Sequence, residues 1–186
     1  MFRITAADRE DLEELLFRRY PNAEWGTFFR FGYRVTSWGA HVTFVKALPP
    51  EAGDLDESSR IVEFRARYIL RAQQAMEEDE LGLGVMHSHP EGCGTGASSL
   101  DEDMDTYFAS EFAACGGARP YVSIRIARDD TGRLSFSGEL HVGRVVIPMT
   151  EFLTIGNTLE RQSAEGYCEA LTKPGADPCL AASLPW

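Results

Sequence analysis

Two histidines and a nearby aspartate are the residues of this sequence best suited to hold a metal ion. His87 and His89 are separated by one serine, and Asp101 follows in the segment Ser98-Ser99-Leu100-Asp101. Three nitrogen and oxygen ligands with an open fourth position are typical of hydrolytic zinc sites, whereas structural zinc usually takes four ligands rich in cysteine. We therefore predict that His87, His89 and Asp101 bind Zn²⁺.

The elements expected around these residues would bring the three ligands together. Residues 81–86 form a short uncharged run, typical of a buried strand, that ends at the histidines. Because side chains alternate along a strand, His87 and His89 are expected to point to the same side. A helix is predicted from Asp101 to Cys115, which would mount Asp101 at a helix N-terminus. An aspartate there also stabilises the helix dipole without any metal.

The loop and the serines before this helix each have a simpler explanation than catalysis. Ser99 and Glu102 lie at the spacing of a capping box, which would only begin the helix. The glycine-containing loop 92–96 could be a plain connector, or it could let a substrate backbone approach closely. Both explanations are compatible with a metal ligand at Asp101.

Hydrophobic periodicity predicts an α/β fold with a mixed, mainly antiparallel sheet flanked by helices. Helices are expected at residues 5–20, from Ser58 or Ser59 to Ala75, and from Pro148 through Phe152, Ile155 and Leu159. Strands are expected at residues 29–35, 41–45, 121–127, 134–142 and 145–147. We divide the chain into a catalytic domain, residues 1–147, and a C-terminal helix with a turn-rich tail, residues 148–186, packed on or extending the same domain.

The composition of the chain limits the classes of protein and of binding partner that need to be considered. The chain has 186 residues, enough for one domain with a sizeable core, and a net charge of −11 that argues against nucleic acid and anionic membranes as partners. The N-terminus lacks the apolar core of a secretory signal, and no apolar run approaches the ~20 residues that span a bilayer. The four cysteines show no CxxC pair. We expect reduced thiols and a cytoplasmic protein.

The motif formed by these residues resembles that of a known enzyme family. His-Ser-His-Pro, a loop, and then Ser98-Ser99-Leu100-Asp101 is similar to the JAMM (MPN-plus) motif of zinc isopeptidases, the family of AMSH, the proteasomal lid deubiquitinase and bacterial JAB proteins. The family also has an upstream glutamate before a glycine and a hydrophobic run, and Glu24-Trp25-Gly26 followed by residues 27–31 matches that pattern. The resemblance implies a single MPN/JAB-like domain of cytidine-deaminase-like architecture.

The resemblance also assigns roles to individual residues. Glu24 would be the general base, His87, His89 and Asp101 the zinc ligands, and Ser98 a hydrogen-bond donor to the substrate or water near the metal. Eight residues separate His89 from Ser98, one more than is usual in the family. This longer loop leaves Ser99 as an alternative to Ser98 and Asp103 as an alternative to Asp101, although the Ser-x-x-Asp spacing favours Ser98 and Asp101.

Glu63 is an alternative upstream carboxylate. It falls on a predicted helix, where pairing with Arg67 four residues later is the ordinary explanation for its charge. Glu24 is therefore the preferred general base.

The function implied by the resemblance is hydrolysis of the amide bond after the C-terminal glycine of a ubiquitin-like modifier, by deconjugation or precursor processing. The expected partners are the modifier, its conjugates, and activating and conjugating enzymes of a bacterial, antiphage-type operon. One alternative is a JAB-type hydrolase acting on a sulfur-carrier protein or a small peptide, and another is a non-catalytic MPN scaffold. A zinc deaminase would need Pro-Cys-x-x-Cys after its His-x-Glu, and the chain has no Pro-Cys-x-x-Cys.

Overall fold

The chain folds around one large, curled sheet. The computed structural model describes residues 1–36, 39–77, 80–115 and 119–164. Within these residues, nine strands lie in the order β7-β6-β5-β4-β2-β3-β1-β8-β9. The strands are β1 (Phe2–Thr5), β2 (Gly26–Thr36), β3 (Gly39–Leu48), β4 (Gly82–Ser88), β5 (Tyr121–Arg128), β6 (Leu134–Val142), β7 (Val145–Pro148), β8 (Glu151–Ile155) and β9 (Leu159–Ser163).

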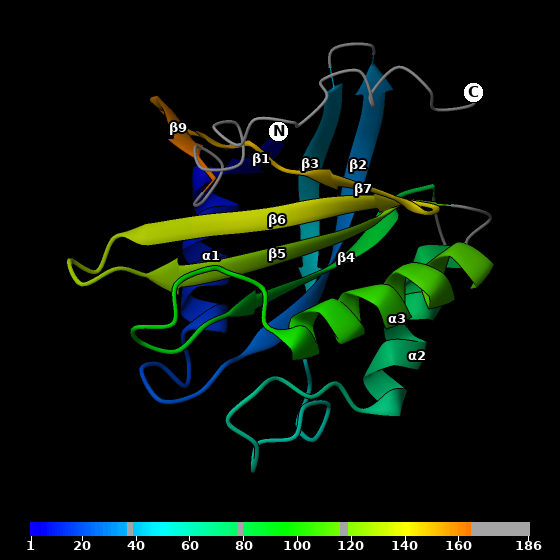
Figure 1. Cartoon of the computed structure of the whole chain (residues 1–186), viewed down its shortest axis with the longest axis horizontal. Helices are drawn as coiled ribbons and strands as arrows, with labels where there is room; N and C mark the ends of the chain where they lie inside the picture. The colour runs from blue at the N-terminus through cyan, green and yellow to red at the C-terminus, as the bar shows by residue number, and fades with distance from the viewer. Residues whose placement is uncertain (37–38, 78–79, 116–118, 165–186) are drawn as a thin grey trace.

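Most neighbouring strands of this sheet are antiparallel. The parallel neighbours are β4 with β5, and β1 with both β3 and β8. The described helices are α1 (Ala6–Leu16), α2 (Ala66–Glu77) and α3 (Ser99–Cys115). Figure 1 shows α2 and α3 next to each other, with α1 apart from them. The predicted mixed, mainly antiparallel sheet with flanking helices is therefore confirmed.

An aromatic cluster joins β2 to the two neighbouring helices. The ring of Phe28, which is fully buried, lies 4.8 Å from that of Tyr68 on α2 and 5.3 Å from that of Phe108 on α3. Both contacts have the edge-to-face arrangement that aromatic pairs favour. The cluster fixes the start of β2 against α3. Of the candidate site residues, Glu24 lies just before β2 and Asp101 lies in the first turn of α3.

Replacing Tyr68 with phenylalanine is expected to destabilise this junction. The Tyr68 hydroxyl accepts a hydrogen bond from the Phe28 backbone amide (3.0 Å) and donates one to the carbonyl of Leu48, and burial raises the pKa of Tyr68 to about 12. Removing it leaves a buried N–H without its acceptor, so we expect the free energy of unfolding in urea to fall by about 1–3 kcal/mol. Tyr33→Phe, at an exposed position, is the control; equal losses would contradict this role.

The helix predicted from Ser58 or Ser59 is wrong in its first part, because α2 begins only at Ala66. Residues 58–61 form a turn and bends, and the residues after them pair with the loop 51–57: Leu55 and Phe64 form a β-bridge, and the amide of Asp56 donates to the carbonyl of Glu63. The expected pairing of Glu63 with Arg67 does not form, since Arg67 pairs with the buried Asp54 instead. Contacts between these two loop segments therefore outweigh the helical periodicity of the hydrophobic residues in the sequence.

The helix predicted from Pro148 is also wrong. Residues 151–155 and 159–163 form β8 and β9, and β8 pairs in parallel with β1 at the N-terminus. Phe152 from β8 stacks on Phe136 of β6, with ring centroids 5.0 Å apart. Strand β1 was not predicted at all. The predicted turn-rich tail lies outside the described residues.

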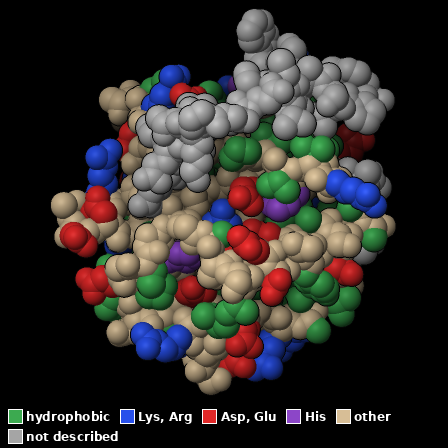
Figure 2. Space-filling view, in the orientation of Figure 1, with side chains coloured by type: hydrophobic (Ala, Val, Ile, Leu, Met, Phe, Trp, Pro, Cys, Tyr) green, Lys and Arg blue, Asp and Glu red, His purple; other side chains and the backbone are tan. Residues whose placement is uncertain are grey.

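The first helix follows its sequence signals more closely. Thr5 caps α1, accepting a hydrogen bond from the amide of Asp8, but the helix ends at Leu16 rather than near Tyr20. No helix among the described residues is both long and apolar enough to cross a membrane. Acidic side chains are spread over the face of the molecule in Figure 2, in keeping with the net charge of −11.

Candidate metal centre

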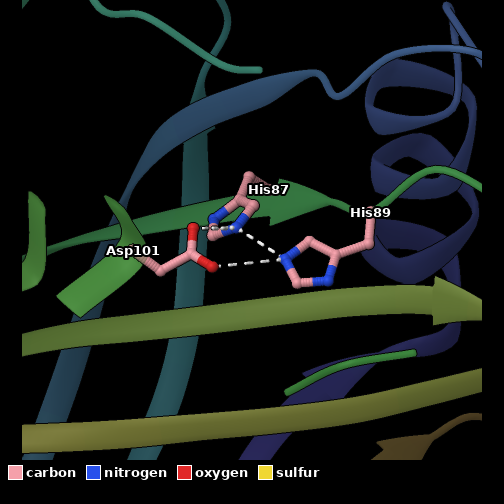
Figure 3. Close-up of side chains that lie close together, drawn as sticks. All are labelled: His87, His89 and Asp101. Carbon is pink, nitrogen blue, oxygen red and sulfur yellow. Dashed lines mark hydrogen bonds and ion pairs between the residues drawn. The ribbon is translucent and has the colours of Figure 1, made fainter. Parts of the chain in front are cut away.

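The predicted ligands meet where β4 ends and α3 begins. Strand β4 lies between β2 and β5, and all its residues are buried. Nε2 of His87 lies 3.1 Å from Nε2 of His89 and 3.1 Å from Oδ1 of Asp101, and His89 Nε2 lies 3.7 Å from Asp101 Oδ2. Figure 3 shows the three side chains pointing toward one another. The prediction that these residues form one cluster is confirmed.

These separations match the geometry of a tetrahedral metal site. Ligand atoms placed 2.0–2.1 Å from a tetrahedral zinc ion lie about 3.3 Å from one another. The two distances from His87 Nε2, to His89 Nε2 and to Asp101 Oδ1, are both 3.1 Å and close to that value, and one ligand atom from each of the three residues lies within 4.8 Å of the others. The side chains also bring two imidazoles and one carboxylate to a buried point, which is a donor set suited to a divalent transition metal. The residues therefore fit a metal ion, while its identity as zinc stays a prediction.

Asp101 is held by the residue that begins α3. The backbone amide and the hydroxyl of Ser98 donate to Asp101 Oδ2 at 2.7 and 2.8 Å, and the amide of Asp101 donates back to the Ser98 hydroxyl. Ser98 is thus the cap of the helix, and the predicted capping box of Ser99 with Glu102 does not form. This reciprocal pairing fixes the direction of the carboxylate toward the histidines.

The tautomer of His89 is set by the glycine-containing loop. His89 Nδ1 lies 2.7 Å from the carbonyl oxygen of Gly94, which can only accept, so Nδ1 carries the proton and Nε2 is left with a lone pair for a metal. Gly94 has φ +55°, a left-handed conformation that glycine adopts without strain. The loop is therefore more than a connector, because its backbone orients a ligand.

Ser88 faces the opposite way from the two histidines. Its hydroxyl donates to the carbonyl of Leu16 at the end of α1 (2.7 Å), and its amide donates to the carbonyl of Trp25. His87 is completely buried, and its Nδ1 has no hydrogen-bond partner among the described residues. The strand thus presents its histidines to the site and anchors its serine in the protein.

Burial and neighbouring groups adjust the protonation of the ligands. Burial, helped by the adjacent His87, lowers the pKa of His89, which favours the neutral imidazole that a metal requires. Burial alone would raise the pKa of Asp101, but hydrogen bonds from His87 and Ser98 outweigh it and hold this pKa well below its usual range. Both directions favour the forms that bind a cation at neutral pH.

Glu24 lies beside the cluster without belonging to it. One of its carboxylate oxygens, Oε2, accepts a hydrogen bond from the amide of Val62 at 2.9 Å, while Oε1 accepts none from the described residues. Its negative charge acts on His89, opposing the lowering of that pKa. Glu24 lines a cleft of about 330 Å³ together with Ser98, Asp101 and residues of the 61–64 segment and α3.

The alternative site residues are placed less favourably. Glu63 also lines the cleft, but it is exposed and no hydrogen bond holds its carboxylate among the described residues. Asp103 is exposed and lies outside the three-residue cluster, and Ser99, although exposed like Ser98, does not line the cleft. The geometry therefore favours Ser98, Asp101 and Glu24 over their alternatives.

Two backbone groups of the site, the carbonyl of Gly94 and the amide of Val62, were not predicted from the sequence. Gly94 lies in a loop whose glycines could have drawn attention to it. No feature of the sequence pointed to Val62, because a backbone amide that orients a carboxylate can belong to any residue type except proline.

A second group of metal-binding residue types lies on α3 and β6 and is already paired with an arginine. Asp105, Glu139 and His141 have ligand atoms within 4.8 Å of one another. The guanidinium of Arg125 lies 3.2 Å from Asp105 and 3.8 Å from Glu139, and Tyr121 donates to Asp105. With a cation supplied by the protein, this group serves to hold α3 against β5 and β6.

Comparisons with known proteins support the fold alone. No protein-family model matches the chain, and no curated protein matches it in sequence. The solution structure of the protein DSY2949 from Desulfitobacterium hafniense, a structural genomics target, is similar with a TM-score of 0.50 and 16% identity. The match covers 90% of this chain and 97% of that one. At this identity the likeness concerns the arrangement of elements and not the chemistry of the site.

Proposed function

We propose that this chain is a zinc-dependent isopeptidase or peptidase that hydrolyses the amide bond after the C-terminal glycine of a ubiquitin-like modifier. The observation that carries the proposal is the buried cluster of His87, His89 and Asp101 beside a cleft that Glu24 and Ser98 line. These are the five residues to which the JAMM resemblance gives roles. A bacterial conjugation system of the antiphage type is the proposed setting.

The donor set determines what a bound metal would contribute. Two neutral imidazoles and one carboxylate would leave a net positive charge on a bound Zn²⁺, which would supply Lewis-acid chemistry at this point. The protein contributes the orientation of the ligands: Gly94 fixes the His89 ring and Ser98 fixes the Asp101 carboxylate.

Glu24 is the group placed to move protons. Its Oε1 is free of hydrogen bonds to the described residues, whereas Oε2 is held by Val62, so the carboxylate is oriented and one oxygen remains available. Glu24 accepts the proton of the attacking water and then delivers it to the leaving amine. Ligation is left to the other three residues, which keeps this carboxylate free for acid–base work.

Ser98 is proposed to stabilise the oxyanion that develops on the scissile carbonyl. Its hydroxyl donates to Asp101 in the described conformation, but its backbone amide donates to the same carboxylate oxygen. The hydroxyl can therefore turn into the cleft while the amide still holds Asp101. A donor aimed at a developing negative charge is an efficient source of rate enhancement.

The proposal is tested with purified, zinc-loaded protein and candidate ubiquitin-like modifiers fused to a short C-terminal extension. We expect cleavage directly after the terminal glycine of the modifier, read by intact mass, and a sharp loss of turnover when that glycine is replaced by leucine. The extended tail of a modifier must bring its last carbonyl to the metal, and we propose that only glycine, which has no side chain, fits the tail position beside it.

Three outcomes of this experiment would count against the proposal. If a modifier ending in leucine were cleaved as fast as one ending in glycine, a ubiquitin-like modifier would be excluded as the substrate class. Binding without cleavage by the zinc-loaded protein would favour the non-catalytic scaffold. Cleavage of short peptides alone would favour the small-substrate hydrolase.

A further inference from the structure

A second polar pocket lies far from the metal centre. Its volume is about 330 Å³ and it is formed at the hairpin end of β2 and β3, next to β1. The metal centre is at the other end of β2, where Gly26 pairs with His87. At about 3.3 Å per residue, the run from Gly26 to Arg34 measures roughly 26 Å, so the two sites are separate. Figure 1 shows this hairpin pointing away from α2 and α3.

The pocket collects basic side chains from three neighbouring strands. Arg34 on β2 stands directly opposite His41 on β3, and Arg3 on β1 is paired with Thr43, two residues along β3 from His41. None of the described residues that line the pocket is acidic. In a chain of net charge −11, two guanidinium groups in a pocket without a carboxylate are a marked local exception.

The hydrogen bonds of these groups leave donors available. Nη2 of Arg3 lies 3.3 Å from Nδ1 of His41. An arginine can only donate, so this nitrogen accepts and the proton of the imidazole sits on Nε2 as a further donor. Neither the Arg34 guanidinium nor the Thr43 hydroxyl has a hydrogen-bond or ion-pair partner within the described part of the chain.

Glycine keeps the floor of the pocket open. Gly32 faces Thr43 across β2 and β3, and no heavy atom of the described structure lies within 4 Å of the place where a Cβ at Gly32 would stand. Its φ is not in the left-handed region, so the backbone does not require glycine there. The missing side chain leaves space between the basic groups.

We propose that Arg3, Arg34 and His41 form a binding site for a phosphate group, free or esterified. A phosphate carries about −1.5 to −2 charge at neutral pH and offers oxygens in several directions, which suits donors arriving from three strands. Guanidinium groups bind such oxygens in pairs, and the anion relieves the repulsion between the two arginines. A carboxylate offers only two oxygens in one plane and one charge. The assignment does not depend on the chemistry of the metal centre.

The test is a titration of the full chain with inorganic phosphate, in which binding is monitored through the NMR signals of backbone amides. We expect saturable shifts at Gly32 and Thr43, and an affinity at least tenfold weaker in Arg34→Gln. The control is Arg133→Gln in the exposed turn between β5 and β6, which removes the same charge elsewhere and should bind like the parent protein. Glycerol phosphate, titrated in parallel, shows by its relative affinity whether the site prefers an ester or the free ion.

A second variant tests the shape of the site rather than its charge. Gly32→Val fills the open floor, where no atom lies within 4 Å of the added Cβ, and should abolish phosphate binding while the unfolding midpoint stays close to that of the parent. Four results would overturn the proposal: no saturable binding, equal loss in Arg34→Gln and Arg133→Gln, equal binding of acetate, or shifts confined to Gly26 beside His87.

Discussion

Replacing His89 with alanine is expected to reduce bound zinc from about one ion per chain to almost none. His89 is one of the three candidate ligands found among the described residues, and the hydrogen bond from its Nδ1 to Gly94 directs its Nε2 to the site. A site with two protein ligands loses most of its affinity, because the remaining positions must be filled by water. Metal analysis of dialysed protein, with circular dichroism to verify folding, measures the effect.

His141→Gln is the matched control for this loss. His141 belongs to the second group of potential ligands, in which Arg125 already supplies the positive charge, so its replacement should leave the zinc content unchanged. If His141→Gln removed the metal and His89→Ala retained it, the metal centre would have to be moved to α3 and β6.

Replacing Glu24 with glutamine is expected to abolish most hydrolysis while zinc content and stability remain those of the parent. Glutamine keeps the size of the side chain and an oxygen for the Val62 amide, but it cannot accept a proton at neutral pH. General acid–base catalysis typically contributes about 10²–10⁴-fold to a rate, so turnover of a modifier fusion should fall by about that factor. Initial rates by intact mass, together with metal analysis, separate the two effects.

Glu63→Gln provides the comparison, since Glu63 lines the same cleft but is exposed and held by no hydrogen bond among the described residues. Turnover of this variant should remain within about twofold of the parent. The opposite pattern, with Glu24→Gln active and Glu63→Gln inactive, would transfer the role of base to the segment that precedes α2.

The ligand cluster was predictable because its determinants are local. The alternation of His87 and His89 along a buried strand places both side chains on one side, and the Ser98–Asp101 spacing makes a helix cap that aims the carboxylate at them. The sequence did not reveal that Ser98 rather than Ser99 is the cap, because both serines precede acidic residues at suitable spacings.

The errors in the fold arise from contacts between distant segments. Phe152, Leu153 and Thr154 are all buried in β8, so the strand lacks the alternation that would distinguish it from a helix. Its partner β1 is only four residues long and lies at the other end of the chain. Likewise, the segment before α2 pairs with the 51–57 loop, and no local pattern encodes that pairing.

The opposed directions of side chains along β4 limit how this protein can change in length during evolution. The Ser88 hydroxyl bonds the end of α1, while the side chains of its two neighbours face the candidate metal site. An insertion of one residue before His87 would therefore exchange the faces and bury a histidine where the serine now bonds Leu16. An insertion in the exposed part of the loop that follows leaves this parity intact. Natural relatives should therefore vary in the loop and keep the strand constant.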